Sequence, residues 1–475
     1  MYTFQDFEKS TDKIGFVRQL ITYHMTSPEY AIARDADLYD HQRNKTINEY
    51  VRVLYDVFGN SIENYIAANN KIASNFFSRL NTQRCTYSLG NGVSFTDHVE
   101  EQVDTDGATV FVDLTKEKLG KKFDTDLYRL AYHAIIHAVA FGYWNSERLY
   151  TFPITEFAPL WDENDGTLRA GVRFWRLAAD KPLIAVLYEE DGFTKYGTTE
   201  DSESLKLLEE KRPYKILTRT TKADGEVIVG TENYGSLPII PLWGSRLKQS
   251  TLIGMREAID SYDLIRSGFA NDLNDCAEIY WLIENYGGMS DGDLMKFRDK
   301  LKFMHIAEAD TSESGKITPY TQEIPYGARS AYLDIIRKGI YEDFGGLDVH
   351  EVSANSTNDH LEAAYQPLDE NADDFEYQVI EFIQQLLSLE GIEDTPLFQR
   401  NRISNEMERT QMILMAANYL DERTILQKLP FITVDEIANI MATKTEEDTE
   451  KYVPGAFGSP SFGPEDEEAQ EDAEV

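Results

Sequence analysis

The chain has 475 residues and is strongly acidic: 46 basic and 83 acidic side chains give a formal net charge of −37. An acidic surface repels phosphate, so this composition speaks against tight, sequence-independent binding of DNA or RNA, although not against a protein that nucleic acid passes without sticking. Hydrophobic residues make up 42% and aromatic residues 12%, as is typical of a folded chain with a sizeable core and about two to four structural regions.

Cysteine usage and hydropathy predict a soluble protein. Cys85 and Cys276 lie in helical or apolar contexts, which indicates small buried hydrophobic residues in a reducing cytoplasm and no disulfide. The N-terminal residues lack the apolar core of a signal peptide. The longest apolar run, Ala131 to Trp144, is too short to span a membrane and carries two histidines. We therefore expect no membrane segment and no membrane partner.

Residues up to about 140 have mostly helical patterning. Apolar residues recur at helical spacing from Ile47 to Phe58 and from Ile62 to Leu80. A Gly-Asn-Gly turn within Ser88 to Phe95 interrupts the pattern. The run from Asp124 to Phe141 predicts another helix, apolar on most of its circumference and therefore buried.

From Trp144 to Trp243 the pattern changes to β-strands. Runs rich in β-branched and aromatic residues are separated by Asp-Gly pairs, which favour tight hairpin turns. These pairs are Asp165-Gly166, Asp191-Gly192 and Asp224-Gly225. The region therefore predicts a set of antiparallel hairpins, closed by a segment with two prolines from Ser236 to Gly244.

The stretch from Thr251 to Asn285 predicts one long amphipathic helix around which the chain is organised. It lacks proline, and its apolar residues recur at steps of three and four: Met255, Ile259, Tyr262, Ile265, Phe269, Leu273, Cys276, Tyr280 and Ile283. At about 1.5 Å per residue it would be roughly 50 Å long. The opposite side carries the acidic residues Glu257, Asp260, Asp263, Asp272, Asp275 and Glu278. The central helix of an ordinary α/β core fits this pattern equally well.

A compact insertion follows from Tyr286 to Pro325, with a short helix, two strands and a polar turn. Its basic residues Lys296, Arg298, Lys300 and Lys302 form a local exception to the acidic balance. They fit either a solvated helix face or a docking surface for an acidic partner. Arg329 to Phe344 returns to helix and stops at Gly345-Gly346, so two helices flanking an insertion predict an antiparallel stalk with a tip.

The C-terminal quarter begins with a loop and ends in a tail. Asp348 to His360 is small, polar and aperiodic, which predicts a mobile loop. Asp373 to Leu389 predicts a helix, and N-cap signals at Ser404, Asp421 and Thr433 predict three short ones. Residues 446–475 hold eleven acidic residues and one lysine, typical of a disordered acidic tail.

The sequence contains no pattern that supports catalysis or cofactor binding. A phosphate-binding GxxxxGK[ST] loop is absent from it. His133 and His137 lie four residues apart, but their HAIIH segment lacks the glutamate of a zinc-binding HExxH motif and has no evident third ligand. The run from Asp162 to Gly166 lacks the glutamate that completes a calcium loop and fits a hairpin turn. We expect no catalytic residues, no cofactor and no metal.

The order of these parts resembles the portal proteins of tailed double-stranded DNA bacteriophages, most closely the SPP1-like type. Five stretches carry the resemblance: Ala33 to Lys45, Asn69 to Phe95, Leu237 to Ser245, Ser261 to Tyr286 and Phe398 to Ile440. None is diagnostic alone, but they occur in the family's order from about residue 30 to 450. This sequence departs from the family at Arg423 and in the short polar segment Ser353 to Asn358, where the family often has a longer apolar, Gly-rich loop.

The resemblance implies an α+β, mainly helical portal fold. Its parts would be a wing over 1–245, helical at first and β-rich from about 144; a first stem helix over 246–285; a clip over 286–325; a second stem or tunnel helix over 326–347; a tunnel loop over 348–360; a return to the wing over 361–403; a crown over 404–445; and the tail. The tunnel loop would include Ser353, Ala354, Asn355, Ser356, Thr357 and Asn358.

The function that the resemblance implies is structural, not enzymatic. Members form a ring, of twelve subunits, at one capsid vertex, through which double-stranded DNA is packaged and ejected. Expected partners are further copies of the chain, the terminase large subunit, a head–tail adaptor, and the major capsid and scaffolding proteins. The protein would lie in the virion, and in the host cytoplasm during assembly. The six acidic residues of the first stem helix would line the channel, and the basic cluster of the clip would dock a partner.

Two other classes of function remain open at this point. A metal-dependent nuclease could use the acidic clusters, provided that they bind two metal ions. A monomeric phage or host interaction protein could pack its long helices on themselves. Mass in solution separates these alternatives from a ring.

Overall fold

The computed structural model describes most of residues 2–402. The gaps are residues 56–57, 65–66, 96, 104–108, 200–201, 222–226, 277–279, 285–291, 293–294, 297–315, 321–325 and 350–357; beyond 402 the structure describes residues 413–415 and 425. The chain divides into two compact units, residues 1–100 with 111–402, and residues 101–110 with 403–475. Among the described residues both helices and strands are extensive, which confirms a mixed α+β fold.

Two sheets form the centre of the first unit. The larger has the antiparallel order β12-β11-β10-β9-β8, and the smaller has the order β15-β6-β7. Their strands are β6 (Val139–Trp144), β7 (Leu149–Pro153), β8 (Phe157–Trp161), β9 (Leu168–Trp175), β10 (Ile184–Glu189), β11 (Gly192–Thr199), β12 (Ser202–Arg212) and β15 (Ile239–Trp243). The predicted antiparallel hairpins are confirmed, including those turning at Asp165-Gly166 and Asp191-Gly192.

Alternation along the strands places two cores on the two faces of the larger sheet. Ala185 and Leu187 pack against helices α1 (Phe4–Lys9) and α2 (Lys13–Met25), together with Phe16 and Val17. Val186 and Tyr188 point the other way, toward strands β6 and β7. Successive residues of a strand face opposite sides, so a single strand serves both cores.

A third core lies on helices. Helix α7 (Phe123–His137) packs with α5 (Phe76–Leu89), the smaller sheet and the long helix α11 (Asn358–Leu389), burying Trp144, Phe375 and Phe382. The predicted burial of α7 is confirmed. It ends at His137, earlier than expected, because Ala138 has φ 78° and β6 begins at the next residue.

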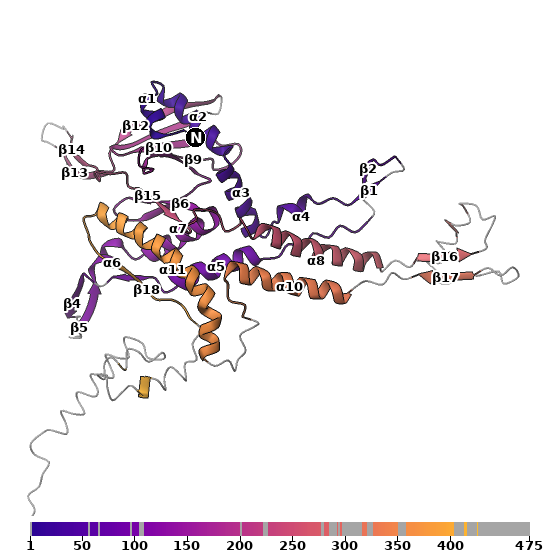
Figure 1. Cartoon of the computed structure of the whole chain (residues 1–475). Coiled ribbons are helices and arrows are strands. Elements are labelled where there is room, and N and C mark those ends of the chain that lie inside the picture. The colour runs from indigo at the N-terminus through magenta and orange to yellow at the C-terminus, as the bar shows by residue number, and fades with distance from the viewer. Residues whose placement is uncertain are drawn as a thin grey trace, which may run out of the picture. The chain divides into compact units, whose positions relative to one another are not determined.

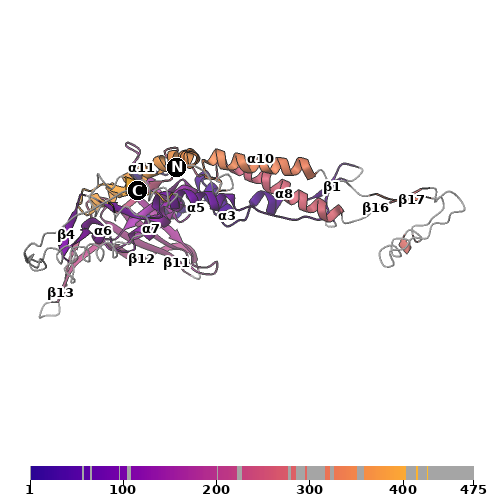
Figure 2. The same ribbon diagram turned by 90° about the horizontal axis from the view of Figure 1, so that it is seen from below.

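The remaining elements are short helices, two-stranded ribbons and the helix pair α8 and α10 (Figures 1 and 2). They are α3 (Pro28–Asp40), α4 (Lys45–Glu49), α6 (Leu114–Leu119), α8 (Arg256–Cys276) and α10 (Tyr326–Phe344), with the paired strands β1 (Val53–Tyr55) and β2 (Ser61–Glu63), β3 (Val93–Phe95) and β18 (Pro396–Phe398), β4 (Val99–Val103) and β5 (Thr109–Asp113), β13 (Lys215–Thr221) and β14 (Val227–Glu232), and β16 (Tyr280–Glu284) and β17 (Lys316–Tyr320).

The predicted helices over 47–58 and 62–80 are wrong. Helix α4 ends at Glu49, and β1 pairs with β2 in a hairpin whose turn contains Gly59 at φ 84°. The run VRVLY before this turn is β-branched and aromatic, a composition that favours a strand. The helix of the second stretch begins only at Phe76.

The long helix is shorter than predicted. Helix α8 ends at Cys276, and Tyr280 to Glu284 form strand β16, which pairs with Lys316 to Tyr320. The run YWLIE carries apolar residues at helical spacing, but its aromatic and β-branched side chains favour a strand once a partner strand is present. The expected single helix over 246–285 is therefore a loop, a helix and a strand.

Two predictions after this point are partly confirmed. Helix α10 includes the predicted span, and Gly345 follows it at φ 67°, as a C-terminal glycine should. The helix predicted from Asp373 begins fifteen residues earlier, at Asn358, and continues through Pro367. The three short helices after residue 404 and the acidic tail lie outside the described residues, apart from a helical piece at 413–415.

Candidate functional site

Helices α8 and α10 run side by side away from the sheets (Figures 1 and 2). Near the sheets they share an apolar cluster that includes Met255, Ile259 and Ile340. Farther along, the ring of Phe269 lies 5.9 Å from that of Tyr326, and an ion pair joins Arg329 to Asp272. The pair is therefore held by apolar packing at one end and by aromatic and charged contacts at the other.

A second face of α8 carries a row of polar residues that we call the polar seam: Asp260, Asp263, Ser267 and Asn271. Their steps of three, four and four residues place them on one side of the helix. Asp263, Ser267 and Asn271 are buried, with at most 4% of their surface exposed. Buried polar groups require partners, and these partners come from a distant part of the chain.

The partner of the polar seam is the segment from Tyr39 to Ser74. The backbone N–H groups of Asn70, Ile72 and Ser74 donate to Asn271 Oδ1 (2.6 Å), Ser267 Oγ (3.0 Å) and Asp263 Oδ1 (2.8 Å), respectively. Every second residue from 70 to 74 therefore donates one backbone hydrogen bond to α8, and the three acceptors are spaced four residues apart along the helix. The side chains of Asn44, Thr46 and Tyr39 add bonds to Asp263 and Asp260.

Asp263 is the most enclosed carboxyl group of the polar seam, with none of its surface exposed. Burial raises its pKa, and the hydrogen bonds from Ser74 and Asn44 oppose this rise. Asn44 Nδ2 donates to Oδ2 over 2.9 Å, so both carboxyl oxygens are satisfied. The carboxyl group therefore links α8 to the segment packed on it through a hydrogen bond at each oxygen.

The structure separates the six acidic residues expected to line a channel. Glu257 is exposed, Asp272 is paired with Arg329, and Asp260 and Asp263 face the segment from Tyr39 to Ser74. Asp263 has no exposed surface to present to a channel, so we do not retain it as a lining residue. Asp275 belongs to α8, with a side chain outside the described part, and Glu278 lies in a gap.

The other predicted site residues fall mostly outside the described residues. Of the basic cluster, Lys296 is helical and exposed, whereas Arg298, Lys300 and Lys302 lie in the gap 297–315. Of the expected tunnel loop, Ser353, Ala354, Asn355, Ser356 and Thr357 lie in the gap 350–357. Asn358 is the first residue of α11.

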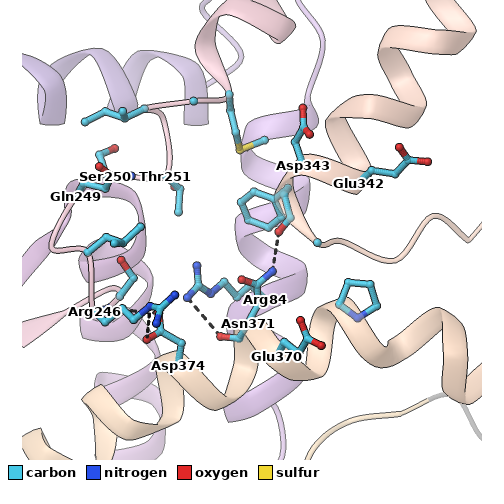
Figure 3. Close-up of a pocket in the computed structure, with 18 of the residues that line it drawn as sticks. Arg84, Arg246, Gln249, Ser250, Thr251, Glu342, Asp343, Glu370, Asn371 and Asp374 are labelled. Carbon is cyan, nitrogen blue, oxygen red and sulfur yellow. Dashed lines mark hydrogen bonds and ion pairs between the residues drawn. The ribbon is translucent and has the colours of Figure 1, made fainter.

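A pocket of about 950 Å³ lies where the loop before α8, the end of α10 and the middle of α11 meet (Figure 3). Arg84 lies on its wall, and its Nη2 donates to the carbonyl oxygens of Gly244 (3.3 Å) and Asn371 (3.4 Å). Asn371 in turn donates to the carbonyl of Phe344, the last residue of α10. Burial lowers the pKa of Arg84. These hydrogen bonds fix the junction of the three helices. Their role is structural, and none of them joins a nucleophile to a base.

The two histidines have different surroundings in the fold. His137 Nε2 lies 2.7 Å from Asp37 Oδ1, and burial lowers the pKa of His133 to about 4. In the part of the chain that the structure describes, no three His, Cys, Asp or Glu side chains come together as metal ligands would. Within the same residues, every helix is too short or too polar to cross a bilayer.

Sequence analysis missed the polar seam. The sequence assigns Asp260 and Asp263 to one acidic face and gives no role to Ser267 and Asn271, which continue their spacing without any charge. A row of mixed polar and acidic residues at helical spacing could have indicated a packed polar face. The partner segment could not have been identified, because its contacts depend on residues about 200 positions away.

The described residues form sheets and helices at the centre with a helix pair extending from them, and no catalytic constellation is evident among these residues. Comparisons with known proteins identify the family. The chain belongs to the family described as "Phage portal protein, SPP1 Gp6-like", whose model matches residues 31–451. This family is structural and implies an oligomeric ring associated with a capsid.

Two relatives carry the name portal protein. That of Clostridium phage phiCD119 is 27% identical over 244 residues, which cover 48% of this chain and 54% of that protein. That of Bacillus phage SPP1 is 21% identical over 434 residues, which cover 84% of this chain and 80% of that protein. The match to the first thus spans about half of its length, and the match to the second spans most of both chains.

Proposed function

We propose that this protein forms a closed ring, of twelve subunits, through which phage DNA enters and leaves the capsid. The observation that carries the proposal is the extended α8–α10 pair, with Glu257 exposed on α8, in a member of the portal family. The pair would be the stem, the sheets and surrounding helices the wing, and residues 286–325 the clip. Residues 348–360 would be the tunnel loop, and 404–445 the crown.

The channel wall would be the side of α8 that carries Glu257. Positions 257 and 275 are eighteen residues apart, which is about five full turns, so they share one line along the helix. With Asp272 and Glu278 they would give an acidic belt in each subunit. Phosphates passing an acidic, hydrated wall meet no deep electrostatic minimum, so DNA can slide in both directions.

Docking would take place at the clip. Lys296, Arg298, Lys300 and Lys302 would attract an acidic surface of the terminase large subunit or of the head–tail adaptor, with a strength that salt reduces. The wing would contact the major capsid and scaffolding proteins. The protein would reside at one vertex of the virion, after assembly in the host cytoplasm.

The test reverses charge on the proposed wall. In Glu257→Lys with Asp275→Lys, each subunit gains two lysines facing phosphate, so packaging should stall, less severely at higher salt. The matched control, Glu117→Lys with Glu210→Lys, makes the same charge change at two exposed positions far along the chain from α8. Incomplete genomes are expected for the wall variant and full genomes for the control. Full genomes in both, with rings confirmed, would contradict the channel assignment.

A further inference from the structure

Residues 50–64, which we call the arm, form a hairpin with little cover from the rest of the chain. Phe58 is 87% exposed and Ile62 56%, and Tyr50, Val51 and Val53 are exposed as well. Val53 pairs with Glu63, and the next position, Leu54, pairs with Ile62, so Val53 and Ile62 lie on opposite faces of the hairpin. A two-stranded hairpin is marginal by itself in water, and this one exposes apolar side chains on both faces.

The base of the arm is nevertheless firmly attached. The polar seam of α8 fixes residues 70–74, and Arg52 Nη1 donates to the carbonyl of Ala68 over 2.8 Å. The N–H of Asn64 donates to the carbonyl of Arg52, also over 2.8 Å, which closes the hairpin. Hydrogen bonds to buried polar groups of α8 therefore hold the base of an exposed apolar hairpin in one place.

The arm and α10 lie on opposite sides of α8. Ser267 contacts the segment that leads from the arm, and Phe269 contacts Tyr326 of α10. Two residues apart on a helix are about 200° apart around its axis. Figure 1 shows the order arm, α8, α10. One chain therefore cannot bring its own arm onto the outer side of its own α10.

The outer side of α10 is a narrow apolar strip. Leu333, Ile336 and Ile340 are wholly or partly buried, whereas the row Ala328, Ala331, Ile335 and Lys338 is exposed. Ile335 is 67% exposed although it is a large aliphatic residue. The strip offers small residues that let another backbone approach and one isoleucine to bury.

We propose that the arm of one copy packs on the outer side of α10 in the adjacent copy. Two different patches on opposite sides of one subunit make a head-to-tail contact, the type that closes rings. The inference rests on the ring of the proposed function and names the surfaces that join its subunits.

Cross-linking tests which surfaces meet. Purified rings of Ile62→Cys with Ile335→Cys are oxidised, and the expected result is a ladder of covalent multimers on a non-reducing gel. Each single variant has one cysteine besides the native Cys85 and Cys276, so it is compared with oxidised wild type and should give no multimers beyond dimers. The matched control, Leu208→Cys with Ile335→Cys, replaces the arm cysteine by one on β12 with similar exposure, 48%, and should give no ladder. Intact rings without a ladder from the first variant would overturn this inference and leave the proposed function standing.

Ring stability provides an independent readout. Val53→Ser with Ile62→Ser should make rings dissociate into subunits at lower urea, with an association constant at least about tenfold weaker per contact. Leu207→Ser with Leu208→Ser removes two comparably exposed leucines from β12 and should leave that midpoint unchanged. Equal midpoints for the arm variant and wild type would overturn the inference. A wild-type protein without rings would overturn it together with the proposed function.

Discussion

The sheet region and the α8–α10 pair bury their large apolar side chains to different extents. In the sheets, most large apolar side chains are covered within the same chain: Phe141, Phe152 and Phe157 are at most 1% exposed. Along the helix pair, large apolar side chains such as Ile335 and Leu273 remain more than half exposed, while polar groups of α8 are buried. The first region is largely buried within one chain, whereas the second would be covered only by other copies in the proposed ring.

The largest expected effect comes from placing a charge where a neighbour should pack. Ile335→Asp would bury an unpaired carboxylate at every interface of the ring, at a cost of several kcal/mol each. Assembly should be abolished. The thermal midpoint of the isolated subunit should stay close to that of wild type, because Ile335 is 67% exposed within one chain. Native mass spectrometry and circular dichroism measure the two quantities. Rings of normal mass would show that α10 has a free outer side.

A core substitution should have the reverse effect. Phe382 is 1% exposed and approaches Gly142 so closely that a Cβ there would lie 2.6 Å from its ring. Phe382→Ala should lower the free energy of unfolding of the subunit by about 3–5 kcal/mol, through lost burial and the cavity left behind. Urea denaturation of the dissociated subunit measures it. A change below about 1 kcal/mol would mean that the sheet region is not the self-sufficient part.

The polar seam should respond to pH. Because the pKa of Asp263 is raised on folding, the folded state binds this proton more tightly than the unfolded state. Its contribution is fully present below the unfolded pKa, about 3.9, and is lost as pH rises through the folded value. Asp263→Asn, which cannot ionise, should lack this loss, so its stability relative to wild type should increase over that range. Parallel pH profiles would contradict the assignment. Asp162→Asn is the control: the pKa of Asp162 is lowered on folding, so the stability of this variant relative to wild type should decrease, not increase, as pH rises.

The smallest effect is expected from the acidic tail. Truncation after Thr445 removes eleven acidic residues and few apolar ones, so little burial is lost. The melting temperature and the ring mass should remain at wild-type values. A fall of several degrees would show that the tail contributes to the packed regions.

Local sequence patterns were sufficient for part of this molecule. The Asp-Gly turns, the buried α7 and the stop of α10 at Gly345 each depend on residues close together in the chain, and the structure has them. Elements that depend on a distant partner were not predicted. Tyr280 to Glu284 kept helical spacing but pair as a strand with residues 316–320, and VRVLY became a hairpin.

The site was predictable to the same extent. The long helix, its companion and the acidic excess are evident from the sequence, and so is the resemblance to portal proteins. The burial of Asp263 beside an exposed Glu257 is not evident, because it depends on residues 39–74 packing across α8. Asp260 and Glu257 are three residues apart and have different surroundings for that reason.

The central claim is that copies of this chain join head to tail into a closed ring. Native mass spectrometry of the full-length protein tests it most directly. A single dominant species at a fixed multiple of the chain mass, twelve in our proposal, unchanged over a wide range of protein concentration, is the predicted result. A monomer at all concentrations, or a continuous series of open oligomers that lengthens with concentration, would contradict it.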